Sequence, residues 1–150
     1  MRIEDEIKQT KPFRSEEQKA GINLMFTSNW YLSKKKKFFE KYNITSQQYN
    51  VLRILKGVYP SVVSTCVIMD RMIDKYSDAS RIVERLFTKK LIDKNVNLND
   101  KRLVDVKINS IGILLIVTIE KDINQLDNFM SSLNQEELIL LNKLLDKLRN

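Results

Sequence analysis

Arginine side chains in two short segments could bind an anionic partner. Arg81 and Arg85 lie four residues apart, and Arg102 follows Lys101 in the polar segment 97–102. A guanidinium group donates two parallel hydrogen bonds to a phosphate, to a carboxylate or to the edge of guanine. The chemistry that these residues offer is recognition of charged groups and base edges.

The rest of the chain lacks the residues that common enzymes and metal sites require. It contains no histidine, which excludes histidine-based zinc sites and the usual catalytic triads. Its three glycines form no phosphate-binding loop. Asp70 and Asp74 have the spacing of a carboxylate pair on a helix, but Arg71 and Lys75 beside them indicate charge pairing at the surface. We therefore predict that the protein is not an enzyme and has no catalytic residue, metal site or cofactor.

The composition favours one folded domain with an anionic partner. Of the 150 residues, 43% are hydrophobic and 30% are charged, as in ordinary globular proteins. The net charge is +7, and the segments 34–41 and 71–107 each carry a net charge of +4. No apolar run is long enough to span a membrane, the N-terminus has no secretory signal, and the one cysteine fits a reducing compartment. These features predict a cytoplasmic protein without membrane contact.

The elements that must position the arginines are mainly helical. Apolar residues at spacings of three, four and seven predict a helix over 14–42. Thr45 and Gln48 form a capping box that begins a second helix. Ser64 or Thr65 caps a short third helix, which precedes the first arginine segment.

A fourth helix carries the first two arginines. Its predicted cap is Ser77. The spacing of its apolar residues predicts one buried face, formed by Ala79, Ile82, Val83, Leu86 and Phe87. Arg81 and Arg85 lie on the opposite face, which is free to meet a partner.

The period of the hydrophobic pattern then changes from helical to alternating. Ile92, Lys94 and Val96 lie among polar neighbours, and residues 103–108 alternate between apolar and polar. The polar segment 97–102 between them predicts a hairpin with a charged tip. The apolar segment 111–129 predicts a buried helix. The last helix opens with a capping box at 134–137, and its leucine seam consists of Leu138, Leu141, Leu145 and Leu148.

Three short helices followed at once by a β-hairpin is the order of a winged helix-turn-helix. In this fold, a helix with small and basic residues enters the DNA major groove. An arginine at the tip of the hairpin, which is called the wing, can reach the neighbouring minor groove, where the negative potential favours a guanidinium. The predicted fold class is mainly α with a small β-hairpin wing (α+β), a winged helix-turn-helix with N- and C-terminal dimerisation helices.

Residues 44–112 resemble the multiple-antibiotic-resistance regulator (MarR) family of bacterial transcription factors. Residues 77–86 (SDASRIVERL) are similar to the recognition helix of that family, and residues 99–102 (NDKR) are similar to its wing. Residues 106–112 (VKINSIG) resemble the segment that leads from the wing into the next helix. The Asp-x-Arg pattern of the wing is the most specific of these elements.

Two residues depart from the family pattern. Lys90 stands where the family usually has glycine, and we expect it to alter the turn into the hairpin without affecting contacts to DNA. Asn109 stands where the family usually has threonine, and asparagine also caps a helix well.

The resemblance implies one MarR-like domain over 1–150, with a winged helix-turn-helix in 44–109 and dimerisation helices in 14–42 and 110–149. It also implies a homodimer that binds a pseudo-palindromic operator in double-stranded DNA and represses transcription until a ligand binds. The leucine seam supports dimerisation independently, because a monomer of this size would struggle to bury it together with the apolar stripe at 22–39.

Candidate site residues follow from the helix pattern and the resemblance together. Arg81 is expected to read guanine in the major groove, and Arg102 is expected to enter the minor groove with Asp100 orienting it. The predicted DNA-binding residues are Ser77, Asp78, Ser80, Arg81, Arg85, Lys101 and Arg102.

The resemblance further implies a small effector, aromatic or amphipathic, bound between the dimerisation helices and the DNA-binding part. Trp30, Tyr31 and Tyr49 are candidates for lining its pocket, and packing in the core is the alternative explanation for each of them. Cys66 is expected to be a small buried side chain. The lysines 34–37 point around a helix turn and are expected to form a solvated face with at most one phosphate contact.

The alternative function is a winged-helix protein-interaction or assembly module that does not bind DNA. Arg81, Arg85 and Arg102 argue against this alternative, because such a module has no need of arginine at all three positions.

Overall fold

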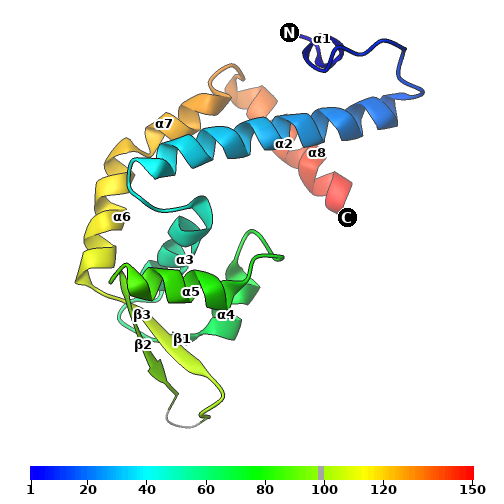
Figure 1. Cartoon of the computed structure of the whole chain (residues 1–150). Helices are drawn as coiled ribbons and strands as arrows, with labels where there is room; N and C mark the ends of the chain where they lie inside the picture. Colours follow the sequence, from blue (N-terminus) through cyan, green and yellow to red (C-terminus); the bar gives the residue numbers. More distant parts are fainter. Residues whose placement is uncertain (98–99) are drawn as a thin grey trace.

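The computed structural model of the protein describes residues 1–97 and 100–150. The predicted wing residue Asn99 lies outside the described residues. The longest element is helix α2 (Glu16–Glu40), which crosses the upper part of Figure 1. Ser15 fixes its start, because the side chain of Ser15 accepts a hydrogen bond from the backbone N–H of Gln18. The predicted helix over 14–42 is confirmed.

A short helix, α1 (Ile3–Glu6), precedes α2 and lies beside it in Figure 1. Glu4 pairs with Lys19 of α2 at 2.7 Å. The hydrogen bond from Lys19 is the main cause that lowers the pKa of Glu4 to about 2. The ion pair that holds α1 to α2 is therefore complete at any physiological pH.

Helices α3 (Ser46–Gly57), α4 (Thr65–Arg71) and α5 (Ala79–Thr88) form the lower part of the molecule in Figure 1. The predicted capping box of α3 is confirmed: the Thr45 hydroxyl accepts from the backbone N–H of Gln48, and the Gln48 side chain accepts from the N–H of Thr45. These three helices have the order predicted from the sequence.

A three-stranded antiparallel sheet accompanies the three helices. It consists of β1 (Val63–Ser64), β2 (Ile92–Val96) and β3 (Val104–Ile108), with β3 in the middle. Val63 pairs with Val106 on one side of β3, and Ile92 pairs with Ile108 on the other. The hairpin β2–β3 follows α5 directly, which confirms the predicted winged helix-turn-helix.

The chain returns to the upper part of the molecule through helix α6 (Ser110–Asp122). It continues through α7 (Asn124–Asp127), a 3-10 turn η1 (Asn128–Met130) and the last helix α8 (Gln135–Arg149). Within the described residues, no helix is both long enough and apolar enough to cross a membrane.

The prediction of one continuous helix over 111–129 is wrong. The hydrogen bond of the Ile123 N–H goes to Glu120, and that of the Leu126 N–H goes to Ile123, so both reach back three residues rather than four. Asn124 and its polar neighbours are weak helix formers, because short polar side chains compete for backbone hydrogen bonds. The helix therefore changes direction between α6 and α7.

The hydrophobic core lies between the three short helices, the sheet and α6. Its fully buried side chains lie on the inward faces of these elements. They include Val51, Leu52, Leu55, Ile68, Met72, Leu86, Ile92, Val106, Ile108, Ile116 and Ile119.

Two predictions about buried residues are wrong. Phe87 was expected in the apolar face of α5, but it is 42% exposed, and the Lys94 ammonium lies 4.7 Å from its ring centroid. A cation over an aromatic face compensates for that exposure. Cys66 was expected to be buried, but it is exposed, because it lies one residue into α4 on the side away from the buried Ile68.

Helix α5 ends in a turn that requires an unusual backbone conformation. The N–H of Lys90 bonds to the carbonyl of Phe87, and the N–H of Leu91 bonds to the carbonyl of Leu86, the paired bonds of a Schellman motif. Lys90 has φ of 58°, in the left-handed region that favours glycine. The departure from the family pattern at Lys90 therefore strains the turn without removing it.

The strain at Lys90 predicts that Lys90→Gly stabilises the protein. A side chain in the left-handed region destabilises the folded state by about 1–2 kcal/mol. Glycine removes this strain, but its greater freedom in the unfolded chain offsets part of the gain. The free energy of unfolding should therefore rise by roughly 0.5–1 kcal/mol. Urea unfolding at a fixed protein concentration measures the change. Lys90→Ala removes the same charge but keeps a Cβ, so an equal gain from alanine would contradict the explanation.

Candidate nucleic-acid interface

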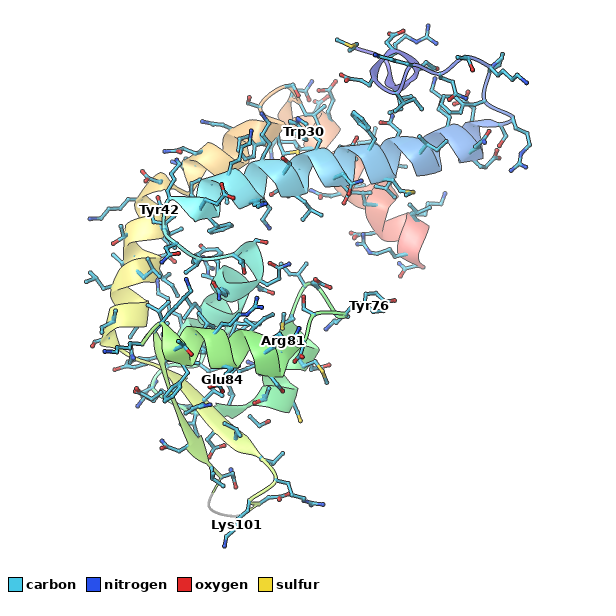
Figure 2. The ribbon with its side chains drawn as sticks, viewed as in Figure 1. Trp30, Tyr42, Tyr76, Arg81, Glu84 and Lys101 are labelled. Atoms are coloured by element: carbon cyan, nitrogen blue, oxygen red, sulfur yellow. The ribbon has the colours of Figure 1, made fainter. Side chains whose placement is uncertain are left out.

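The outward face of α5 is the first part of the candidate interface. Ala79, Val83 and Leu86 are buried, so the helix turns the opposite side to solvent. Ser80 and Arg81 are exposed on this side. Figure 2 shows Arg81 on α5 and Lys101 at the far end of the hairpin. The helix and the hairpin thus present basic side chains from two separate elements.

Two of the predicted DNA-binding residues form hydrogen bonds within the protein at the start of α5. The prediction that Ser77 caps α5 is wrong, because the Asp78 carboxylate accepts the hydrogen bond from the N–H of Arg81 at 3.0 Å. The Ser77 hydroxyl instead donates to the Asp74 carboxylate at 2.6 Å, and this bond is the main cause that lowers the pKa of Asp74. Ser77 and Asp78 therefore fix where the helix begins.

Tyr76 is an exposed side chain that the sequence reasoning missed. Its N–H bonds to the Asp74 carboxylate at 3.1 Å, while its side chain is fully exposed at the tip of the loop before α5 (Figure 2). An aromatic residue in an otherwise polar loop was the available signal. Its place two residues before the cap of α5 puts it beside the candidate interface.

Arg81 and Arg85 differ in their surroundings. Arg85 lines a hollow of about 350 Å³ beside the start of α3, together with Thr45, Gln48 and Lys89. Arg81 does not line this hollow. The structure therefore places Arg85 at the flank of α5, closer to α3 than to the outward face.

The hairpin is fastened to α5 by one lysine. The Lys94 ammonium of β2 pairs with the Glu84 carboxylate of α5 and lies over the ring of Phe87. Both contacts are made to the side of α5 that faces the hairpin. Lys94 thereby limits how far the wing can move relative to the recognition helix.

Asp100 holds Arg102 at the tip of the wing. The Nε and Nη2 groups of Arg102 donate to the two carboxylate oxygens of Asp100, each at 3.0 Å, and the N–H of Arg102 also donates to Asp100. This pairing lowers the pKa of Asp100 and raises that of Arg102. The Arg102 side chain is nevertheless 89% exposed, so it is both oriented by Asp100 and accessible to a partner.

A hollow of about 330 Å³ joins the tip end of the wing to the starts of α4 and α5. Arg102, Ser80 and Thr65 line it together with Ser77 and Cys66. The structure therefore brings the helix residues and the wing arginine, which are more than twenty positions apart in the chain, to one concave surface.

A separate cavity of about 300 Å³ lies between α2, α3 and α7. Tyr31 and Tyr49 line it, as do Lys35 and Arg53. Trp30 does not line this cavity; its ring packs edge-on against Phe129 at 6.3 Å. The structure thus brings two of the three predicted pocket residues together and places the third elsewhere.

Lys35 is the cation of this cavity that has no ion pair within the described residues. Burial lowers its pKa, and its ammonium lies 5.5 Å from the ring centroid of Tyr31. Arg53, by contrast, pairs with Glu120 at 3.4 Å. An anion in the cavity would therefore find its strongest unmet partner in Lys35.

The lysines 34–37 spread around α2, as predicted. Lys34 lies 6.0 Å from the ring centroid of Trp30, while Lys36 pairs with Glu40 at 4.0 Å. With Lys35 in the cavity, these lysines do not share one surface.

Apolar side chains on α2 and α8 are left without cover in the protomer. Of the predicted seam, Leu138, Leu141 and Leu145 are half-buried and Leu148 is exposed. The most exposed apolar side chains of α8 and α2 are Leu148, Met25, Leu140, Leu144, Leu32, Ile139 and Leu24. So many exposed apolar side chains on two helices are typical of a protein–protein interface.

Solved structures similar to this one are transcription regulators. A MarR transcription factor from Planctomyces limnophilus is similar with a TM-score of 0.71 and 26% identity, over 90% of this chain and 98% of that one. A MarR variant from E. coli, solved in complex with operator DNA, is similar with a TM-score of 0.77 and 20% identity, over 92% and 99%.

BpsR from Bordetella bronchiseptica, whose DNA binding is regulated by 6-hydroxynicotinic acid, is similar with a TM-score of 0.74 and 20% identity, over 87% and 98% of the two chains. By sequence, no family model and no curated relative matches the chain. The structural similarity covers both the winged part and the outer helices. The chain therefore has the fold of the MarR-family transcription regulators over most of its length, which confirms the resemblance indicated by its recognition helix and wing.

Proposed function

We propose that the protein is a homodimeric transcriptional repressor that binds double-stranded DNA sequence-specifically and is released by a small ligand. The observation that carries the proposal is the exposed Arg81 on α5 beside a wing whose Arg102 is held outward by Asp100. The operator complex of MarR and the ligand-regulated DNA binding of BpsR support it. A regulator of this kind acts in the cytoplasm, where the chromosome lies.

The arrangement of the arginines fits two modes of reading DNA. In the major groove, Arg81 can donate two hydrogen bonds to guanine. In the minor groove, Arg102 senses groove width and A·T content rather than a base pattern. Two copies related by a twofold axis would place their α5 helices in successive major grooves about 34 Å apart, which matches a pseudo-palindromic operator.

The dimer that this mode of binding requires can form through α2 and α8. Their uncovered apolar side chains lie outside the winged part, and they come from two helices that are far apart in the chain. Burying them against a second copy contributes roughly 25 cal/mol for each Å² of apolar area removed from water. The half-buried leucines of the predicted seam, Leu138, Leu141 and Leu145, would extend the same interface.

The cavity between α2, α3 and α7 is suited to an aromatic acid as the effector. Tyr31 and Tyr49 offer aromatic walls, and Lys35 offers a partly buried ammonium that forms no ion pair within the described residues, while the Asp127 carboxylate also lines the cavity. A bound carboxylate would raise the pKa of Lys35 back toward its ordinary value. The ligand lies against α3, which packs on α5, so binding can alter the position of the recognition helix.

Dimerisation through α8 predicts that Leu140→Glu with Leu144→Glu yields a monomer. The two carboxylates would have to be buried without partners, which costs several kcal/mol. Sedimentation equilibrium measures the mass, and operator binding should be lost with the dimer. Asn142→Glu, which adds a carboxylate on the other side of α8, should remain dimeric. A double variant that stays dimeric would remove α8 from the interface.

Replacing Arg81 and replacing Arg102 should impair DNA binding in different ways. Arg81→Ala should cost about 1–3 kcal/mol of binding and relax the preference at one position in each half-site. Arg102→Ala should weaken binding to operators with flanking A·T tracts and leave the core preference unchanged. Selection of binding sites from random DNA with each variant distinguishes the two.

Arg14→Ala is the matched control for these variants, because it removes one exposed arginine outside the interface. It should retain the full sequence preference. A shifted core preference from Arg102→Ala, or an unchanged affinity, would contradict the minor-groove assignment.

The effector proposal predicts that Lys35→Gln selectively weakens binding of carboxylates. We expect 6-hydroxynicotinic acid to bind at least roughly tenfold more weakly to the variant, whereas the neutral 6-hydroxynicotinamide should bind both proteins equally. Because burial lowers the pKa of Lys35, affinity for the acid should begin to fall at a pH below the ordinary range of lysine. Lys34→Gln is the neighbouring control, and calorimetric titration gives both affinities. Equal losses for acid and amide would show that Lys35 shapes the cavity without pairing with the anion.

A further inference from the structure

Helix α6 exposes an apolar face that neither the DNA-binding surface nor the dimer surface uses. Ile111 is 55% exposed, Leu114 66% and Val117 41%. Their spacing of three residues places them along one side of the helix. The opposite side of α6 is buried in the core through Ile116 and Ile119.

A hollow of about 480 Å³ lies against this face. Its walls come from α6, from the loop between α2 and α3, and from the end of α5. The side chains that line it are mainly apolar, and they include Tyr42, Ile44, Leu91, Ile111, Leu114 and Leu115. The surface is therefore concave, so a protruding apolar side chain can enter it.

One lysine lines the hollow, and two more lie close in the chain to residues that line it. Lys89 lines it and donates to the backbone carbonyl of Asn43. Lys121 lies exposed on α6, seven residues after Leu114 and so on the same side of the helix. Lys41 is exposed at the end of α2 and donates to Gln125 at 2.7 Å.

The Asp122 carboxylate, next to Lys121 in the chain, contributes a negative charge to this region. Asp122 accepts a hydrogen bond of 2.5 Å from the phenol of Tyr42. Burial and this bond raise the pKa of Tyr42 to about 12, so the phenol remains a donor at physiological pH. Asp122 keeps its negative charge, but Lys41, Lys89 and Lys121 outnumber it, so the region around the apolar centre has a net positive charge.

The position of α6 leaves this face accessible in the proposed dimer. In Figure 1, α6 lies at one edge of the molecule, while α8 ends toward the opposite edge. The residues proposed for dimerisation belong to α2 and α8, and those proposed for DNA binding belong to α5 and the hairpin. A third surface is thus available while both others are occupied.

We propose that this face of α6 binds an amphipathic helix of another protein, with an apolar stripe flanked by acidic residues. The stripe would insert into the hollow, and the acidic residues would lie against Lys41, Lys89 and Lys121. A second copy of the chain would bring like charges together on this face. A membrane would meet a concave rather than a flat apolar surface.

The test uses a designed helical peptide with leucines at helical spacing and glutamates beside them, labelled with a fluorophore. Fluorescence anisotropy with the full-length protein should give a dissociation constant in roughly the micromolar range. The same peptide with lysine in place of every glutamate should bind at least about tenfold more weakly, because its charges face these three lysines.

The variant Ile111→Gln with Leu114→Gln should lose peptide binding by at least roughly tenfold and keep operator binding, since both residues are exposed and neither lines the hollows that contain Arg85 and Arg102. Val96→Gln, another exposed apolar residue, is the control and should leave peptide binding unchanged. Failure of the glutamate peptide to bind, or equal binding by the lysine peptide, would overturn the proposal. Two further results would also overturn the proposal. If the double variant forms a smaller assembly than the unaltered protein, the face binds a second copy of the chain. If the unaltered protein floats with anionic phospholipid vesicles and the double variant does not, the face binds a membrane.

Discussion

The backbone around Leu91 connects all parts of the winged domain. Its N–H closes the turn at the end of α5, and its carbonyl accepts a hydrogen bond from the N–H of Asn109 at 3.4 Å. The Asn109 side chain bonds in turn to the carbonyl of Lys90 and caps α6. Gly112 completes the junction, because a Cβ there would lie 2.2 Å from the Leu91 carbonyl oxygen. Helix α5, the hairpin and α6 therefore meet at one short backbone segment, Lys90–Leu91.

This junction explains how the upper and lower parts of the molecule can influence each other. Helix α6 runs from Asn109 to the segment that packs on α2, and α3 packs against α5 and α6. A ligand between Tyr31 and Tyr49 would press on α2 and α3 at the same time. Since the junction at Leu91 is closely packed, a shift of α3 or α6 is passed to the orientation of α5 rather than absorbed locally.

The sequence predicts those features that depend on local spacing. The capping box at Thr45, the alternation in 103–108 and the apolar face of α5 depend on neighbouring residues, and the structure has all three elements. The features it did not predict depend on individual side-chain contacts that hydrophobic spacing does not reveal. Phe87 is half-exposed because Lys94 lies over it, and Asp78 displaces Ser77 as the cap because Asp74 engages the Ser77 hydroxyl. The break after α6 is weakly encoded, since the apolar pattern continues across it.

The candidate site divides in the same way. The Asp-x-Arg spacing predicts that Asp100 orients Arg102, because a carboxylate would be repelled by DNA phosphates, and the structure contains that pair. Tyr31 lines the cavity and Trp30 does not, although the rings of both pack edge-on against Phe129, at 6.5 Å and 6.3 Å. No local sequence pattern reveals this contact with Phe129.

The pairing of Asp100 with Arg102 has a consequence for the thermodynamics of the wing. The guanidinium is already immobilised, so entering a groove costs little of the rotamer entropy that a free arginine would lose. The pair is also electrically neutral as a unit, so its insertion releases few condensed counterions from DNA. The wing would then contribute a part of the binding free energy that persists as ionic strength rises, whereas the contribution of the unpaired cations on the same surface declines.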